Sequence, residues 1–162
     1  MKKLYLSITL GALLVGCTNK EAVHEPLQNE LLSYTQKFEK VNRSDRYLAI
    51  ATYINPVLKS SDLKERFILS SYPVEESIEM SSLKVNGDAN LSVRELDYDD
   101  ELLKLANINL PWSKHYEIIS PEKKADYLTI TYETSKNTKA NLKFLKVSKS
   151  MYWSPKIELK ND

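Results

Sequence analysis

The apolar and polar positions divide the chain into an apolar start, a polar linker, a segment of helical period and a long segment of period two. Residues 4–15 are apolar and uncharged, and they follow Lys2 and Lys3. This run is shorter than the roughly 20 residues that a membrane-spanning helix needs, and its positive start is typical of a secretory signal peptide. We therefore expect a signal peptide over residues 1–16 and a polar tether over residues 17–26.

The segment after the tether has a helical period. Pro26 suits the first turn of a helix, and the apolar residues that follow recur at spacings of four and three, which places them in one stripe: Leu27, Leu31, Tyr34, Phe38 and Val41. The pattern predicts an amphipathic helix over residues 27–43. Its stripe should pack on the core of the domain or, alternatively, on a partner.

From Arg46 onward the period becomes two, and β-branched and aromatic residues become frequent. This pattern predicts strands over residues 46–55, 65–72, 77–85, 115–120, 126–133 and 141–148, with a possible edge strand near Ile157 and Leu159. The dipeptide Asn86-Gly87 predicts a type I′ turn that pairs the third strand with a segment through Leu91 and Val93.

One interruption of the strand pattern is acidic and leucine-rich. Residues 97–107 begin with Asp97, Asp99, Asp100 and Glu101 and continue with leucines. Acidic side chains at the start of a helix interact favourably with its dipole, so we expect a short helical insert. The cluster lacks the spacing and the glycine of an EF-hand calcium loop, which makes a calcium site the weaker interpretation.

Many short strands with little helix between them predict an antiparallel β-sandwich of immunoglobulin-like type over residues 46–160, with one N-terminal helix and a short helical insert. A curled sheet packed by the N-terminal helix is the alternative. Cys17 is the only cysteine. The Cys-Trp-Cys pattern of antibody domains is therefore absent, and the fold depends on its apolar core rather than on disulfides.

The end of the apolar start, Leu14-Val15-Gly16-Cys17, resembles the lipobox of bacterial lipoproteins. The resemblance implies cleavage before Cys17, a covalent diacylglycerol and a further acyl chain such as palmitate on Cys17, and attachment to the cell membrane through these lipids. Thr18 follows Cys17, where an Asp commonly retains such proteins at the inner membrane, so the outer membrane is favoured and a periplasmic or surface orientation stays open. The rest of the chain resembles only in a general way small lipoproteins with immunoglobulin-like domains.

Charge and candidate chemistry argue for binding rather than catalysis. The chain has 23 basic and 22 acidic residues, and removal of the signal peptide takes away Lys2 and Lys3, which leaves 21 basic residues. The mature protein then has no excess of positive charge, so a nucleic acid partner is not expected. His24 lies in the tether, so His115 is the one imidazole expected in the domain. Ser113 lies close to it but lacks the glycines of a nucleophile elbow. We expect no enzyme activity, no metal and no cofactor besides the covalent lipid, and a hydrolase is the least favoured alternative.

Aromatic side chains are the remaining candidates for binding. They gather around residues 111–116 and 151–155, and aromatic rings with a polar group suit protein interfaces and sugar stacking. The candidate partner or glycan contacts are Trp112, His115, Tyr116 and Trp153. The favoured function is a structural or assembly role in the envelope through protein interactions, and the alternative is a carbohydrate-binding module for peptidoglycan or surface polysaccharide. The same aromatic residues would also suit plugs at the ends of the sandwich.

Overall fold

The structure is a computed structural model, and it describes residues 26–43, 45–59 and 62–146. The expected signal peptide, Cys17, nearly all of the tether, Trp153 and the possible strand near Ile157 and Leu159 lie outside the described residues. No helix among the described residues is long and apolar enough to cross a membrane.

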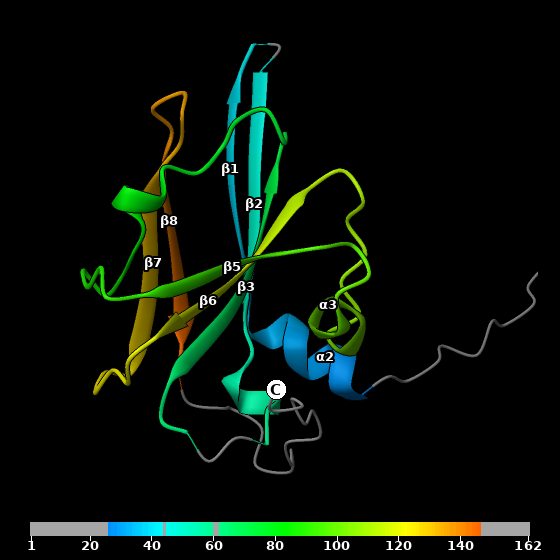
Figure 1. The fold of residues 1–162 in the computed structure, drawn as a ribbon, viewed down its shortest axis with the longest axis vertical. Helices are drawn as coiled ribbons and strands as arrows, with labels where there is room; N and C mark the ends of the chain where they lie inside the picture. The colour runs from blue at the N-terminus through cyan, green and yellow to red at the C-terminus, as the bar shows by residue number, and fades with distance from the viewer. Residues whose placement is uncertain (1–25, 44, 60–61, 147–162) are drawn as a thin grey trace, which may run out of the picture.

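The described chain is mainly β and forms two antiparallel sheets, as predicted (Figure 1). The larger sheet has the order β1-β2-β3-β6-β5, and the smaller sheet has the order β4-β7-β8. The strands are β1 (Thr35–Asn42), β2 (Asp45–Tyr53), β3 (Glu65–Tyr72), β4 (Lys84–Val85), β5 (Ser92–Leu96), β6 (Lys114–Ser120), β7 (Tyr127–Glu133) and β8 (Lys139–Leu145).

The two sheets pack face to face over a shared apolar core. On β7 the buried positions alternate with half-buried ones, as the sequence predicted for Leu128, Ile130 and Tyr132. They meet side chains of the larger sheet such as Phe67 and Ile118, which are fully buried in the same cluster. Alternation of this kind is expected where only one face of an antiparallel sheet is buried.

A second apolar cluster covers the outer face of the larger sheet. It joins α2 (Pro26–Ser33), α3 (Glu101–Leu105) and the short 3₁₀ helix η1 (Asn55–Val57) to β3. Ile68 belongs to this cluster because it points to the opposite side of β3 from Phe67. Helices, larger sheet and smaller sheet therefore form three successive layers, with α2 and α3 side by side (Figure 1).

The helical insert forms where the acidic segment predicted it, although it is shorter than residues 97–107. Helix α3 begins after Asp100, whose side chain accepts a hydrogen bond from the Leu102 N–H at 2.8 Å. Asn107, with a φ of 52°, takes the left-handed conformation that commonly follows a helix end. The acidic residue at the start of this helix therefore acts as a helix cap.

The helix predicted over residues 27–43 is wrong beyond Ser33. Residues 35–42 form β1, which pairs with β2 in a continuous register from Thr35 opposite Thr52 to Asn42 opposite Asp45. A spacing of four, as between Tyr34 and Phe38, also places two side chains on one face of a strand. Pairing with β2 decides between the two periods, so the sheet begins before residue 46.

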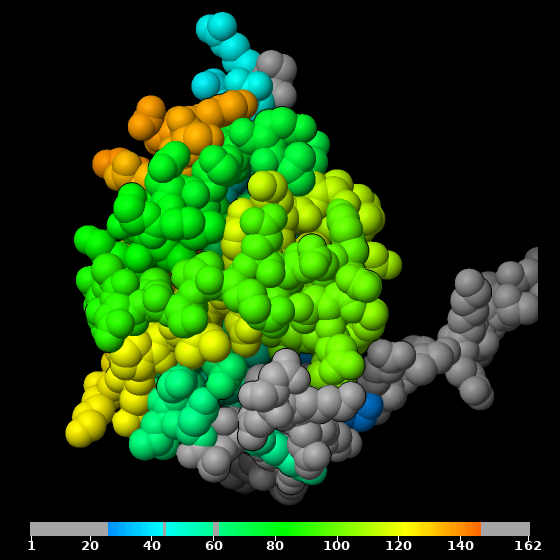
Figure 2. All heavy atoms as spheres, in the orientation of Figure 1, coloured from blue at the N-terminus to red at the C-terminus, as the bar shows by residue number. Residues whose placement is uncertain are grey.

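The β1–β2 hairpin (cyan) and the β7–β8 turn (orange) project at the same end of the molecule (Figure 2).

The strand predicted over residues 77–85 is also wrong for most of its length. Only Lys84–Val85 forms a strand, after the 3₁₀ helix η2 (Met80–Ser82). Asn86 and Gly87 have φ of 50° and 81°, as a type I′ turn requires. The segments on either side do not form the predicted hairpin, because β4 pairs with β7 and β5 pairs with β6. Asn86 fixes the turn to β7 by donating to the Tyr127 carbonyl and accepting from the Thr129 N–H.

A buried charge links the two sheets at the end that carries Leu145. Glu65 on β3 is only 1% exposed. Its carboxylate lies 2.7 Å from the Lys146 ammonium, which follows β8, and accepts hydrogen bonds from the Tyr53 hydroxyl at 2.7 Å and the Lys123 N–H at 2.9 Å. The buried carboxylate is thus paired and hydrogen-bonded, which is the condition for burying a charge.

Candidate functional site

The aromatic candidates around β6 do not form one exposed surface. Trp112 lies in the connection between α3 and β6 and is 55% exposed. His115 and Tyr116 are both buried on β6 and, as consecutive strand residues, point to opposite faces of the sheet. Tyr116 enters the core between the sheets, whereas His115 faces the helical layer.

His115 is held by contacts on three sides. Its Nδ1 lies 2.7 Å from the Ser70 Oγ, its Nε2 lies 3.2 Å from the Leu110 carbonyl oxygen, and the Tyr98 ring packs edge-on with 5.9 Å between ring centroids. Burial lowers the pKa of His115, so the imidazole is neutral at pH 7. Because a carbonyl oxygen only accepts, Nε2 carries the proton, and Nδ1 therefore accepts from the Ser70 hydroxyl.

A serine hydroxyl that donates to a neutral imidazole is the first element of a hydrolytic site. Ser70, however, lies within a strand that is paired on both sides, with Ile50 on β2 and with His115 on β6. Backbone N–H groups that belong to such ladders are not available to form an oxyanion hole. The geometry therefore gives a candidate base and hydroxyl, but strand β3 itself offers no free N–H groups to stabilise an acyl-transfer intermediate.

Ion pairs across the outer face of the larger sheet use several carboxylates of the acidic segment and its neighbours. Glu117, 7% exposed, lies between Arg66 and Arg94, at 3.3 Å and 3.1 Å respectively. Arg94 also contacts Asp100 at 2.6 Å. Burial alone would raise the pKa of Asp100, but Arg94 and the Leu102 N–H outweigh it and lower this pKa.

Within the described ranges, no group of three or more His, Cys, Asp or Glu could hold a metal ion.

Strand β5 forms one edge of the larger sheet. Among the described residues it pairs with β6 alone, and four of its five residues are exposed. A groove of about 480 Å³ opens at the start of β5 and the end of β6. Its apolar lining includes Leu63, 70% exposed, as well as Leu91, Ile119 and Pro121. An unpaired edge beside an apolar groove is suited to an extended peptide.

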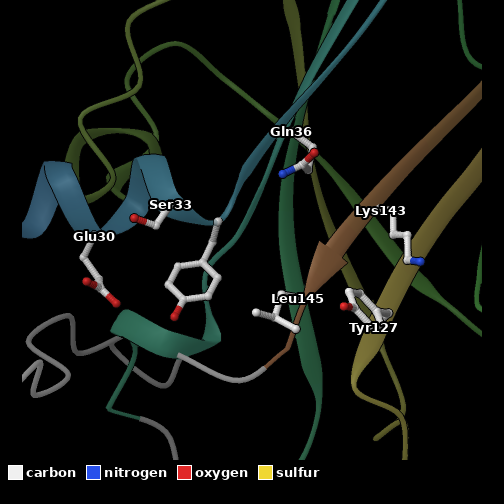
Figure 3. Close-up of a pocket in the computed structure, with 7 residues that line it drawn as sticks. Glu30, Ser33, Gln36, Tyr127, Lys143 and Leu145 are labelled. Atoms are coloured by element: carbon white, nitrogen blue, oxygen red, sulfur yellow. The ribbon is translucent and has the colours of Figure 1, made fainter. Parts of the chain in front are cut away.

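A second and larger groove, of about 800 Å³, lies between α2 and β1 on one side and β7 and β8 on the other (Figure 3). Glu30, Ser33 and Gln36 provide polar groups on one side of it, and Leu145 lies on the other. Tyr127 is 51% exposed, and the Lys143 ammonium lies 4.2 Å from the centroid of its ring. This groove combines an exposed aromatic ring with hydrogen-bonding side chains.

Comparison with known proteins gives no independent assignment. No family model, no curated protein and no solved structure matches this chain. The contacts of the described residues are therefore the basis for a functional proposal.

The sequence missed Ser70, Leu63 and Tyr127. Ser70 meets His115 through the register of β3 against β6, and no motif marks a pair that lies 45 positions apart. Leu63 and Tyr127 belong to the grooves only because loops and strands that are distant in sequence meet there. The alternation of β7 did place Tyr127 on the exposed face of its strand.

Proposed function

We propose that this protein is a lipid-anchored, non-enzymatic component of a bacterial cell envelope, and that its domain binds another envelope protein. The lipobox-like Leu14-Val15-Gly16-Cys17 supports lipid attachment at Cys17. Two or three acyl chains on one residue give stable anchoring, whereas one gives only marginal binding. The outer membrane is the favoured location because Thr18 stands where an Asp would retain the protein.

An immunoglobulin-like topology is part of this proposal. In immunoglobulin constant-type domains, strands A, B, E and D form one sheet and strands C, F and G form the other. The orders β2-β3-β6-β5 and β4-β7-β8 correspond to this arrangement strand by strand, with β1 as an additional strand beside β2. This correspondence supports a scaffold of the kind that often presents binding surfaces at its edges and loops.

The edge of β5, which is unpaired among the residues that the structure describes, lies beside an apolar groove, and this observation carries the choice of a protein partner. An extended segment could add to β5 through backbone hydrogen bonds, and the groove at Leu63 would then accept an apolar side chain from it. Val93, 37% exposed, lies on this edge. Strand addition requires backbone hydrogen bonds and apolar side chains, both of which a polypeptide supplies. The partner at this edge is therefore proposed to be a protein.

Site-specific photo-crosslinking in intact cells tests this proposal. A photo-crosslinking amino acid in place of Val93 should give a discrete protein adduct, and the same group in place of the exposed Lys136 on the β7–β8 turn should not. Leu63→Asp should abolish the Val93 adduct, because it places a charge in the apolar groove. Val41→Asp, a change at a similarly exposed position on β1, is the control and should leave the adduct unchanged. No adduct at Val93, or equal adducts at Val93 and Lys136, would contradict a partner at this edge.

The groove at Tyr127 favours carbohydrate binding as the second candidate function. An exposed ring on one side of the groove, with Gln36, Ser33 and Glu30 across from it, offers stacking and hydrogen bonds to a sugar (Figure 3). Tyr127→Ala should then remove binding to isolated peptidoglycan or surface polysaccharide, whereas Tyr98→Ala, which changes a similarly exposed ring on the helical side, should not. If Tyr127→Ala and Tyr98→Ala bound the polysaccharide equally well, the result would contradict a sugar site at Tyr127, and the protein partner would stand as the better proposal.

A further inference from the structure

A third cavity lies on the outer face of the larger sheet, beneath α2, and the proposed function does not use it. This cavity, which we term the α2 cavity, has a volume of about 430 Å³. It is bordered by α2, by the outer faces of β1, β2 and β3, and by the connection that follows α3, and it is partly open to solvent. Its lining consists of Gln28, Leu31, Leu32, Thr35, Ile50, Thr52, Ser70, Ala106, Asn107, Ile108, Asn109 and Leu110. The volume falls within the range of small-molecule sites, which is about 300–1,000 Å³.

The lining of the α2 cavity contains no Asp, Glu, Lys or Arg. A charged ligand would lose part of its hydration there without gaining an ion pair, which is unfavourable. Half of the twelve lining residues are aliphatic, and most of the lining surface is apolar; the aliphatic residues are Leu31, Leu32, Ile50, Ala106, Ile108 and Leu110. The cavity therefore selects for an uncharged and largely apolar ligand.

The three hydroxyls that line the cavity, those of Thr35, Thr52 and Ser70, have already used their protons. The Thr35 hydroxyl donates to the Leu31 carbonyl at 2.8 Å, so the Thr52 hydroxyl, 2.8 Å from the Thr35 Oγ1, is the donor of that pair. The Ser70 hydroxyl donates to His115 Nδ1, as derived above. Each hydroxyl has one proton and two lone pairs, so the Thr52 and Ser70 oxygens can still accept hydrogen bonds.

Gln28 adds a third acceptor. Its Oε1 is buried and has no hydrogen-bond partner among the described residues, and its side chain borders the α2 cavity. A buried acceptor without a donor costs about 1–3 kcal/mol. A donor brought by a ligand would remove this cost once the Gln28 amide turns toward the cavity.

We propose that the α2 cavity binds an uncharged, largely apolar ligand that donates hydrogen bonds, such as an aliphatic chain that ends in a hydroxyl or an amide N–H. Such a ligand fills the aliphatic part of the cavity and meets the acceptors of Gln28, Thr52 and Ser70. The position of the cavity fits a ligand that partitions into membranes. Helix α2 begins at Pro26, and the eight residues 18–25 that separate it from Cys17 span at most roughly 30 Å.

A photoreactive analogue tests the proposal on the full chain in vesicles of phosphatidylethanolamine and phosphatidylglycerol. The probe is N-lauroylethanolamine with a diazirine in its acyl chain, and mass spectrometry locates the adduct. We expect adducts within residues 26–35 or 106–110. Unlabelled N-lauroylethanolamine should compete about tenfold better than methyl laurate, which has the same chain without donors, because two hydrogen bonds of ordinary strength are worth that factor. Laurate, charged at pH 7, should compete least.

Matched variants separate the α2 cavity from the rest of the surface. Ile50→Trp should fill the cavity and abolish the adduct, whereas Leu48→Trp, two residues away on the same face of β2 and outside the cavity, should not. Gln28→Leu should reduce the preference for N-lauroylethanolamine over methyl laurate by about threefold without lowering the melting temperature, because it removes an unpaired acceptor. Equal competition by the two neutral ligands in the unmodified protein would overturn the proposal. So would labelling that survives Ile50→Trp as well as it survives Leu48→Trp.

Discussion

His115 and Ser70 lie directly opposite each other in the β3–β6 ladder, and their side chains meet with 2.7 Å between Nδ1 and Oγ. On its other side the same imidazole contacts the Leu110 carbonyl at 3.2 Å. His115 therefore attaches the connection that follows α3 to the middle of the larger sheet. That connection forms one wall of the α2 cavity, so the single histidine of the described chain supports the cavity rather than an exposed binding surface.

Stability should depend on pH through His115. Burial lowers the pKa of His115 in the folded protein, so over an interval below about pH 6.5 the unfolded chain binds a proton that the folded protein does not. The contribution of His115 to the free energy of unfolding is therefore fully present above about pH 6.5, and it decreases as the pH drops from there toward the lowered pKa. Urea unfolding of the protein and of His115→Asn at a series of pH values measures this contribution, which the variant should lack.

The other histidine provides the control for that experiment. The sequence predicts that His24 lies in the tether segment, and His24→Asn should leave the pH dependence between about pH 5 and 7 as it is. If His115→Asn kept the original dependence over this interval, the imidazole would not be the group that titrates on unfolding.

Ser70 should not act as a nucleophile. It lies in a strand paired on both sides, whose N–H groups are not available for an oxyanion hole, so a fluorophosphonate reagent that labels serine hydrolases should give no adduct at Ser70. Ser70→Ala should instead lower the free energy of unfolding by about 1–3 kcal/mol, because Nδ1 of His115 loses its donor. A stoichiometric adduct that disappears in Ser70→Ala would show hydrolase chemistry and contradict a purely binding role.

The buried ion pair of Glu65 and Lys146 should be important for stability. Lys146→Met leaves the Glu65 carboxylate buried without its cation, and removing one partner of a buried pair costs about 3–5 kcal/mol. Lys139→Met is the matched control from the same end of the sequence. Its side chain is 78% exposed and its ammonium pairs with Glu133 at 3.3 Å, so its loss should cost at most about 1 kcal/mol. Equal losses in urea unfolding would contradict the role assigned to Glu65.

The sequence predicted those elements whose side chains alternate without ambiguity. On β7, Leu128, Ile130 and Tyr132 enter the core, and their alternation identifies both the strand and its buried face. Helix α3 was equally readable because Asp100 supplies a cap and leucines follow it. In both cases the local pattern and the tertiary packing favour the same structure.

Elements that depend on pairing partners were not predictable in this way. Tyr34 and Phe38, four positions apart, fit both a helix and a strand, and β1 forms because β2 offers an antiparallel edge. The turn at Asn86 and Gly87 was readable from its residue types, but the sheets to which β4 and β5 belong were not. Two further features depend on strand register, namely the Ser70–His115 contact and the α2 cavity. Strand register is difficult to predict from a single sequence.

Cys17 should be the lipid-bearing N-terminus of the protein in cells. Mass spectrometry of the intact membrane-bound protein should show that residues 1–16 are missing and that Cys17 carries a diacylglycerol-sized addition, because the segment Leu14-Val15-Gly16-Cys17 resembles a lipobox. Cys17→Ser should prevent both changes and leave residues 1–16 attached, since serine offers no thiol to the lipid. In a two-membrane cell, Thr18→Asp should move the lipidated protein to the inner-membrane fraction, and Thr18→Ser, the matched control, should not. A Cys17→Ser protein that is still cleaved and lipid-modified would show that the anchor lies elsewhere.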